Sequence, residues 1–207
     1  MCGDYRGQGA LAQQSEAVCT DAPTETLMPG EIVVLEVTEF TIRFTWGNAD
    51  FLQDFLLYNV QVTSVDGSQP SEQPVLDLQR RMATYTGLEP GVEYTLSVNV
   101  VTEDDFNNLL LTENQRTKPL APPGVCRVVS GSITPVGLRL SWNEAAGQFG
   151  LYKVTYTEPG GLSQYEAGAT NRDTTELDVT NLYPATDYLF TVVTVSGTGD
   201  SATTSSP

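Results

Sequence analysis

The side chains most able to act in catalysis or metal binding are the carboxylates and the three cysteines, because the sequence contains no histidine. Without histidine, neither a Ser-His-Asp triad nor a Cys-His pair can activate a nucleophile. The commonest zinc ligand is absent as well, and Cys2, Cys19 and Cys126 are too scattered to form a Cys-x-x-Cys site. No GxxxxGK(S/T) or GxGxxG loop is present to cradle a phosphate. We therefore expect no enzymatic activity, no metal and no cofactor.

Four consecutive residues, Glu103, Asp104, Asp105 and Phe106, form the sharpest local feature of the sequence. They follow an alternating segment, residues 94–100, and we expect them to lie in the loop after that strand. Binding residues commonly gather in such loops, so these four are a candidate partner-binding site with Phe106 as an apolar anchor. Alternatively, Phe106 packs beneath the loop and the carboxylates are only solvated. Their spacing differs from the Asp-x-Asp-x-Asp ladder of a calcium site.

The strong negative charge limits the partners of this chain. The formal net charge is −16, from 26 acidic and 10 basic residues. A chain of this charge repels the phosphate groups of nucleic acids and of anionic lipids. We therefore expect other proteins as partners, and no nucleic-acid or membrane contact by this segment itself. The simplest interpretation of the charge is solubility.

The sequence features that indicate the structural framework occur twice along the chain. Its only two tryptophans end alternating apolar–polar segments, and each is followed by a tyrosine-led segment and then by Leu-x-Pro-x-x-x-Tyr. The three pairs of landmarks keep one order and lie 94 to 96 positions apart: Trp46 and Trp142, Tyr58 and Tyr152, and residues 88–94 and 182–188. An internal repeat of this kind indicates two copies of one structural unit.

Each landmark lies in a segment typical of a β-strand. Residues 41–46 and 94–100 alternate strictly, which places apolar side chains on one face of a strand. Glycine- and proline-containing turns separate such segments. Short alternating strands with regular turns predict an all-β fold of two tandem antiparallel β-sandwiches. The prolines near residue 119 break strand pairing, so we expect one domain at 28–118 and the other at 119–207.

At these landmarks the sequence resembles the fibronectin type III family. That family has a tryptophan in its second strand, a tyrosine in its third and a Leu-x-Pro-x-x-x-Tyr corner. The resemblance covers residues 28–207 and implies immunoglobulin-like sandwiches. It implies a structural core that includes eight side chains: Trp46, Tyr58, Leu88, Tyr94, Trp142, Tyr152, Leu182 and Tyr188. It also implies that the corner tyrosines hydrogen-bond back to the backbone of the preceding corner.

The first 27 residues resemble the end of a preceding unit plus a linker. The segment 15–20 lies 97 positions before residues 112–117, which we expect to be the last strand of the first complete unit. Cys2 and Cys19 could form a local disulfide, which would leave the third cysteine free or buried. At the other end, residues 201–207 stop where we expect the last strand of the second unit to finish. Both ends of the chain therefore suggest a fragment of a longer array.

The resemblance implies a non-catalytic extracellular segment of a cell-surface receptor or matrix protein, which acts as a spacer and as a protein-binding surface. The linker is also similar to those of receptor-type tyrosine phosphatase ectodomains, which is a weaker suggestion. Two alternatives stay open at this point. One is an accessory module of a secreted enzyme, and the other is an intracellular structural array of the muscle-filament type.

Overall fold

A computed structural model describes residues 31–47, 55–65, 71–75, 81–102, 107–158, 160–161, 163–199 and 202–206. The expected remnant at 1–27, with Cys2 and Cys19, lies outside the described residues, and so does the acidic loop from Glu103 to Phe106. Every named element of the described residues is a β-strand, and all strand pairs are antiparallel. The predicted all-β fold is thereby confirmed.

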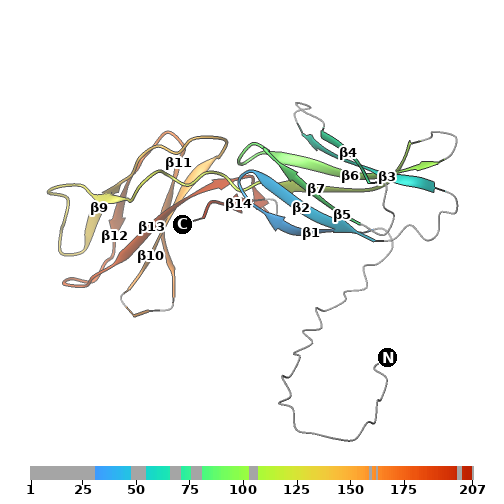
Figure 1. The fold of residues 1–207 in the computed structure, drawn as a ribbon. Helices are drawn as coiled ribbons and strands as arrows, with labels where there is room; N and C mark the ends of the chain where they lie inside the picture. The colour runs from blue at the N-terminus through green and yellow to red at the C-terminus, as the bar shows by residue number, and fades with distance from the viewer. Residues whose placement is uncertain are drawn as a thin grey trace, which may run out of the picture.

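The first unit consists of two antiparallel sheets (blue to green in Figure 1). Its strands in the described part of the chain are β1 (Ile32–Val37), β2 (Thr41–Trp46), β3 (Phe55–Ser64), β4 (Ser71–Val75), β5 (Met82–Thr86), β6 (Glu93–Thr102) and β7 (Asn107–Arg116). One sheet has the order β1-β2-β5, and the other has the order β4-β3-β6-β7. The last strand, β7, pairs along almost the whole of β6.

The second unit repeats this topology (yellow to red in Figure 1). Its strands are β8 (Arg127–Val128), β9 (Gly137–Ser141), β10 (Leu151–Thr157), β11 (Tyr165–Asn171), β12 (Glu176–Thr180), β13 (Leu189–Ser196) and β14 (Thr203–Thr204). The orders are β12-β9-β8 and β11-β10-β13-β14. The two sandwiches follow one another along the molecule (Figure 1), so the prediction of two tandem units is confirmed.

Alternation along the strands explains where the two cores form. In β2, Ile42, Phe44 and Trp46 are fully buried, whereas the residues between them stay half-exposed. The Trp46 ring stands edge-on to the Tyr58 ring from the facing sheet, with centroids 5.5 Å apart. This aromatic geometry is favoured by the ring quadrupoles and fills the space between the sheets.

The second core uses the same contact between the corresponding residues. The rings of Trp142 and Tyr152 lie 5.4 Å apart, again edge to face, and both side chains are buried. Leu182 is buried beside them. Tyr188 is only half-buried, although its counterpart Tyr94 is buried. The two units therefore place corresponding residues in their cores, but they differ in how completely those side chains are buried.

The corner tyrosines hold the turn before strands β6 and β13. The backbone amide of Glu89 donates to the Tyr94 hydroxyl at 2.9 Å. In the second unit the Tyr183 amide donates to the Tyr188 hydroxyl, also at 2.9 Å. Beside the first of these corners, Leu88 is half-buried and packs against the edge of the core. Each hydroxyl thus ties a corner to the strand that follows it.

We predict that Tyr94→Phe lowers the free energy of unfolding of the first unit by about 1–3 kcal/mol, because a part-buried amide loses its acceptor. Tyr188→Phe should cost less, since the exposed amide of Tyr183 can bond to water instead. Urea denaturation measures both changes when unfolding is monitored through the fluorescence of each unit's single tryptophan. Equal losses in the two units would contradict this account.

Candidate functional site

The carboxylates of the described residues do not assemble into a reactive centre. In that part of the chain no group of three or more histidine, cysteine, aspartate or glutamate residues lies close enough to hold a metal ion. The described residues also include no helix long and apolar enough to cross a membrane. The acidic loop predicted as a binding site lies outside them, so it stays a prediction.

Several described carboxylates instead pair with basic side chains across neighbouring strands. Arg116 Nη2 lies 2.7 Å from Glu93 Oε2 between β6 and β7. On the exposed face of β9 and β12, Arg139 makes two hydrogen bonds to the Asp178 carboxylate, at 2.7 and 2.8 Å. This hydrogen bonding lowers the pKa of Asp178. Such cross-strand pairs support a sheet, and an ionised surface carboxylate of this kind is not poised for acid catalysis.

The two sandwiches meet at a hydrogen-bonded joint. Hydroxyl groups of the second unit donate to backbone carbonyl oxygens of the first unit and the linker: Ser196 to Gly91 at 2.6 Å, Thr203 to Thr117 at 3.0 Å and Thr194 to Leu120 at 2.7 Å. The side chains of Ser196 and Thr194 are buried. Buried polar groups are costly to leave unpaired, so these bonds oppose separation of the units.

Gly91 lets the two backbones approach at this joint. Its φ of +75° lies in the left-handed region that favours glycine. A Cβ at this position would overlap the backbone carbonyl oxygen of Gln148 in the second unit. Arg116 Nη1 also donates to the Gly91 carbonyl, at 3.0 Å. The corner of the first unit is therefore shaped to receive the loop before β10.

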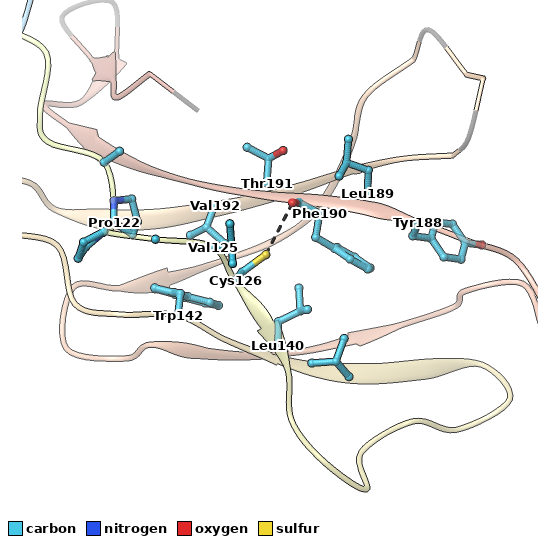
Figure 2. Close-up of a pocket in the computed structure, with 14 residues that line it drawn as sticks. Pro122, Val125, Cys126, Leu140, Trp142, Tyr188, Leu189, Phe190, Thr191 and Val192 are labelled. Carbon is cyan, nitrogen blue, oxygen red and sulfur yellow. Dashed lines mark hydrogen bonds between the residues drawn. The ribbon is translucent and has the colours of Figure 1, made fainter.

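An apolar groove of about 500 Å³ runs along one side of the second unit, between the segment that leads into β8 and strand β13 (Figure 2). We call it the edge groove. Its lining contains no charged side chain, although the chain as a whole is strongly acidic. Val125 and Leu189 at its rim are 75% and 69% exposed. An uncharged, concave surface of this kind is suited to apolar side chains rather than to an ionic ligand.

Cys126, the free cysteine of the described residues, lies in the edge groove. Its Sγ lies 3.6 Å from the carbonyl oxygen of Phe190, and the thiol acts as a weak donor to it (Figure 2). Partial burial raises the pKa of the thiol. A protonated thiol is a poor nucleophile, and the partly buried side chain of Cys126 packs against the core of the second unit.

A second apolar surface lies at the turn before β9 and the corner before β13. It comprises Ile133, Val136 and Tyr183, which are 72%, 56% and 71% exposed; we call it the corner patch. Exposed apolar side chains that gather at one place commonly mark a protein contact. In the first unit, the corner at the corresponding position is the one that contacts the second unit.

Sequence reasoning missed the joint, the edge groove and the corner patch. The sequence around Gly91 predicts only a turn, since nothing local distinguishes a turn glycine from one that another domain approaches. The groove depends on how the segment before β8 lies beside β13, which alternation does not reveal. One signal was available for the joint: the repeat pairs Gly91 with Ala185, so the two corners differ at this position.

Comparison with known proteins places this geometry in a family. The model of the fibronectin type III domain matches residues 27–109 and 121–207. Mouse tenascin-N is 29% identical over 193 residues, which are 92% of this chain and 12% of that protein. The rabbit collagen alpha-1(XII) chain is 24% identical, over 83% of this chain and 26% of that protein. The chain therefore spans a small part of the length of these relatives.

A solved structure shares the fold. A segment of two fibronectin type III domains from chicken tenascin superposes with a TM-score of 0.52 at 20% identity, covering 86% of this chain and 95% of that one. The matrix relatives indicate an extracellular location and an extracellular matrix or adhesion module. Both sandwiches are matched by the family model over most of their length, and the chain belongs to the fibronectin type III family.

Proposed function

We propose that this chain is a non-catalytic spacer and protein-binding segment of a larger extracellular matrix or adhesion protein. The joint between the sandwiches is the observation that carries the spacer role. Opening it would leave the carbonyl oxygens of Gly91 and Leu120 without their hydroxyl donors, at a cost for every group that stays buried. Two units held in this way keep a fixed separation between whatever binds on either side of them.

The short coverage of the tenascin and collagen relatives supports a larger parent protein, since the chain corresponds to only 12% and 26% of their lengths. The extracellular relatives favour a matrix setting over an intracellular muscle-filament array. In a matrix protein, a stiff pair of sandwiches separates binding sites and bears force along the chain.

Two surfaces are proposed for protein binding. The corner patch presents Ile133, Val136 and Tyr183 to solvent, and a large aromatic ring beside aliphatic groups is a common anchor at interfaces. The loop from Glu103 to Phe106 stays a second candidate on its sequence alone. The two surfaces suit different partners, because one is apolar and the other is acidic.

The spacer role predicts that Gly91→Ala uncouples the two sandwiches, because the new methyl group meets the Gln148 carbonyl oxygen. Residual dipolar couplings measured by NMR report the relative orientation of the units. One alignment tensor should fit both units of the unaltered chain, whereas the variant should need two. A single tensor in the variant would show that the close approach at Gly91 does not hold the joint.

Gly87→Ala is a matched control for this variant. Gly87 has the same φ of +75°, yet a Cβ there would meet nothing within 4 Å. Both substitutions should therefore destabilise the first unit by about 1–2 kcal/mol through backbone strain. Only Gly91→Ala should also change the alignment tensors, which separates the joint from the strain.

The proposed parent protein predicts the size of the native polypeptide. An antibody raised against residues 28–207, used to blot membrane and soluble fractions of the source tissue, should detect a band far above the 22.4 kDa of this chain. A band near that mass would instead indicate a free-standing pair of sandwiches, and the proposal of a larger parent would be wrong.

A further inference from the structure

The linker that follows β7 at the joint has a basic residue on either side of the buried Thr117, namely Arg116 and Lys118. Serine proteases of the trypsin class cut the peptide bond that follows an arginine or a lysine. The bond after Lys118 precedes Pro119, whose nitrogen lies in a ring and has no hydrogen, and such a bond resists these enzymes. The bond from Arg116 to Thr117 is therefore the one that the linker offers for cleavage.

The first unit holds the residues on both sides of this bond. Arg116 Nη1 donates to the Gly91 carbonyl oxygen at 3.0 Å, and Nη2 donates to the Glu93 carboxylate at 2.7 Å. Thr117 is completely buried, and its amide donates to the Val92 carbonyl oxygen at 3.0 Å. A protease must draw both residues out of these contacts before it can bind them.

The second unit covers the linker from the other side. The Thr203 hydroxyl donates to the Thr117 carbonyl oxygen at 3.0 Å, and the Thr194 hydroxyl donates to that of Leu120 at 2.7 Å. A protease binds its substrate in an extended form and needs several residues on both sides of the bond that it cuts. Because burial and hydrogen bonding of the backbone decide where a chain is cut, the closed joint protects this bond.

One carbonyl oxygen connects the arginine to the joint. The Gly91 carbonyl oxygen accepts from Arg116 and also, at 2.6 Å, from the buried Ser196 hydroxyl of the second unit. The Gln148 backbone lies against the same glycine. Separation of the sandwiches removes both neighbours and admits water, which competes for the hydrogen bonds of the guanidinium group. The arginine is therefore held best while the joint is closed.

Three backbone hydrogen bonds still hold the linker to the first unit once the sandwiches separate. They run from the Thr117 amide to Val92, from the Gly91 amide to Lys118 and from the Lys118 amide to Thr38. All three lie beyond the last residue pair of the β6–β7 ladder. The end of a strand frays at a much lower cost than a whole domain unfolds. Opening of the joint therefore gives access to the bond while both sandwiches stay folded.

We propose that the joint guards a cleavage site for a serine protease of the trypsin class, the peptide bond between Arg116 and Thr117. This inference rests on the proposed spacer role, since it requires a joint that is closed at rest. Separation of the sandwiches, for instance by tension along the chain, frees the linker. Hydrolysis then adds water across the bond, which leaves a carboxylate on Arg116 and an amino group on Thr117. The cut disconnects the two sandwiches, so an overstretched spacer is severed at its joint.

The test uses trypsin as the probe and places its variants in the second unit, so that the first unit stays intact. Thr203→Val and Ser196→Ala each remove one hydroxyl donor of the joint. Thr204→Val is the matched control, because it removes an exposed hydroxyl from the neighbouring residue of β14. Labelling of new amino termini followed by mass spectrometry gives the initial rate at Thr117 separately from cuts elsewhere.

In the unaltered chain, the guarded bond should be cut at least about 100-fold more slowly than the same bond in a synthetic peptide of residues 111–122. When the joint opens and closes quickly relative to cleavage, the rate follows the population of the open form. Thr203→Val and Ser196→Ala should therefore each raise the rate about tenfold, whereas Thr204→Val should leave it unchanged.

Two further measurements separate opening of the joint from unfolding. Gly91→Ala should raise the cleavage rate more than Gly87→Ala, because only the first of these methyl groups meets the second unit. Cleavage after Arg139, which lies within β9, should be the same in the unaltered chain and in the variants of the second unit. A constant rate there shows that the second sandwich stays folded.

Three results would overturn the inference. One is cleavage of the unaltered chain as fast as the peptide, because the joint would then not cover the linker. Another is the same rate in Thr203→Val, Ser196→Ala and Thr204→Val. The third is a parallel rise after Arg139, which would assign the cut to unfolding. The alignment tensors test the spacer role independently: a single tensor with an unresponsive bond rejects only the cleavage site, and two tensors for the unaltered chain reject the spacer role.

Discussion

The edge-to-face contact of one tryptophan with one tyrosine sets the distance between the two sheets in each unit. Trp46 meets Tyr58 in the first unit and Trp142 meets Tyr152 in the second, at nearly equal separations. Each ring comes from a different sheet, so neither sheet can slide without losing the contact. In the remaining strands, the alternation of apolar and polar residues then decides only which side chains pack around this contact and which face solvent.

Because each unit is organised around this tryptophan–tyrosine contact, the sequence could predict the fold. The spacing of Trp46, Tyr58 and the corner tyrosine recurs in the second unit, so the fold and its number of units follow from side-chain periodicity. The candidate sites depend on backbone positions that lack such periodicity. The approach of Gln148 to Gly91 arises from a contact between distant segments. Local patterns carry no record of such contacts.

Corresponding inward-facing residues of the two units are buried to different degrees in the described part of the chain. Inward-facing residues of β6 are fully buried because β7 covers their edge, whereas those of β13 keep contact with solvent. A sheet edge with free backbone groups is a liability unless it is paired or covered. In the second unit this need is met in part by a thiol, since Cys126 bonds to the Phe190 carbonyl. A thiol is a weak donor, so this bond satisfies the carbonyl group only in part.

The stiffness of such an array is decided at its corners and not by the family fold. Gly91 allows the Gln148 backbone of the second unit to lie against the corner, and its own carbonyl oxygen accepts from the Ser196 hydroxyl. The corresponding corner of the second unit has Ala185, which adopts a left-handed φ of 55° despite its methyl group. That methyl group occupies the space into which a neighbour's backbone would have to move. A sandwich that docked at this corner would therefore need a different and more distant arrangement than the one that Gly91 allows.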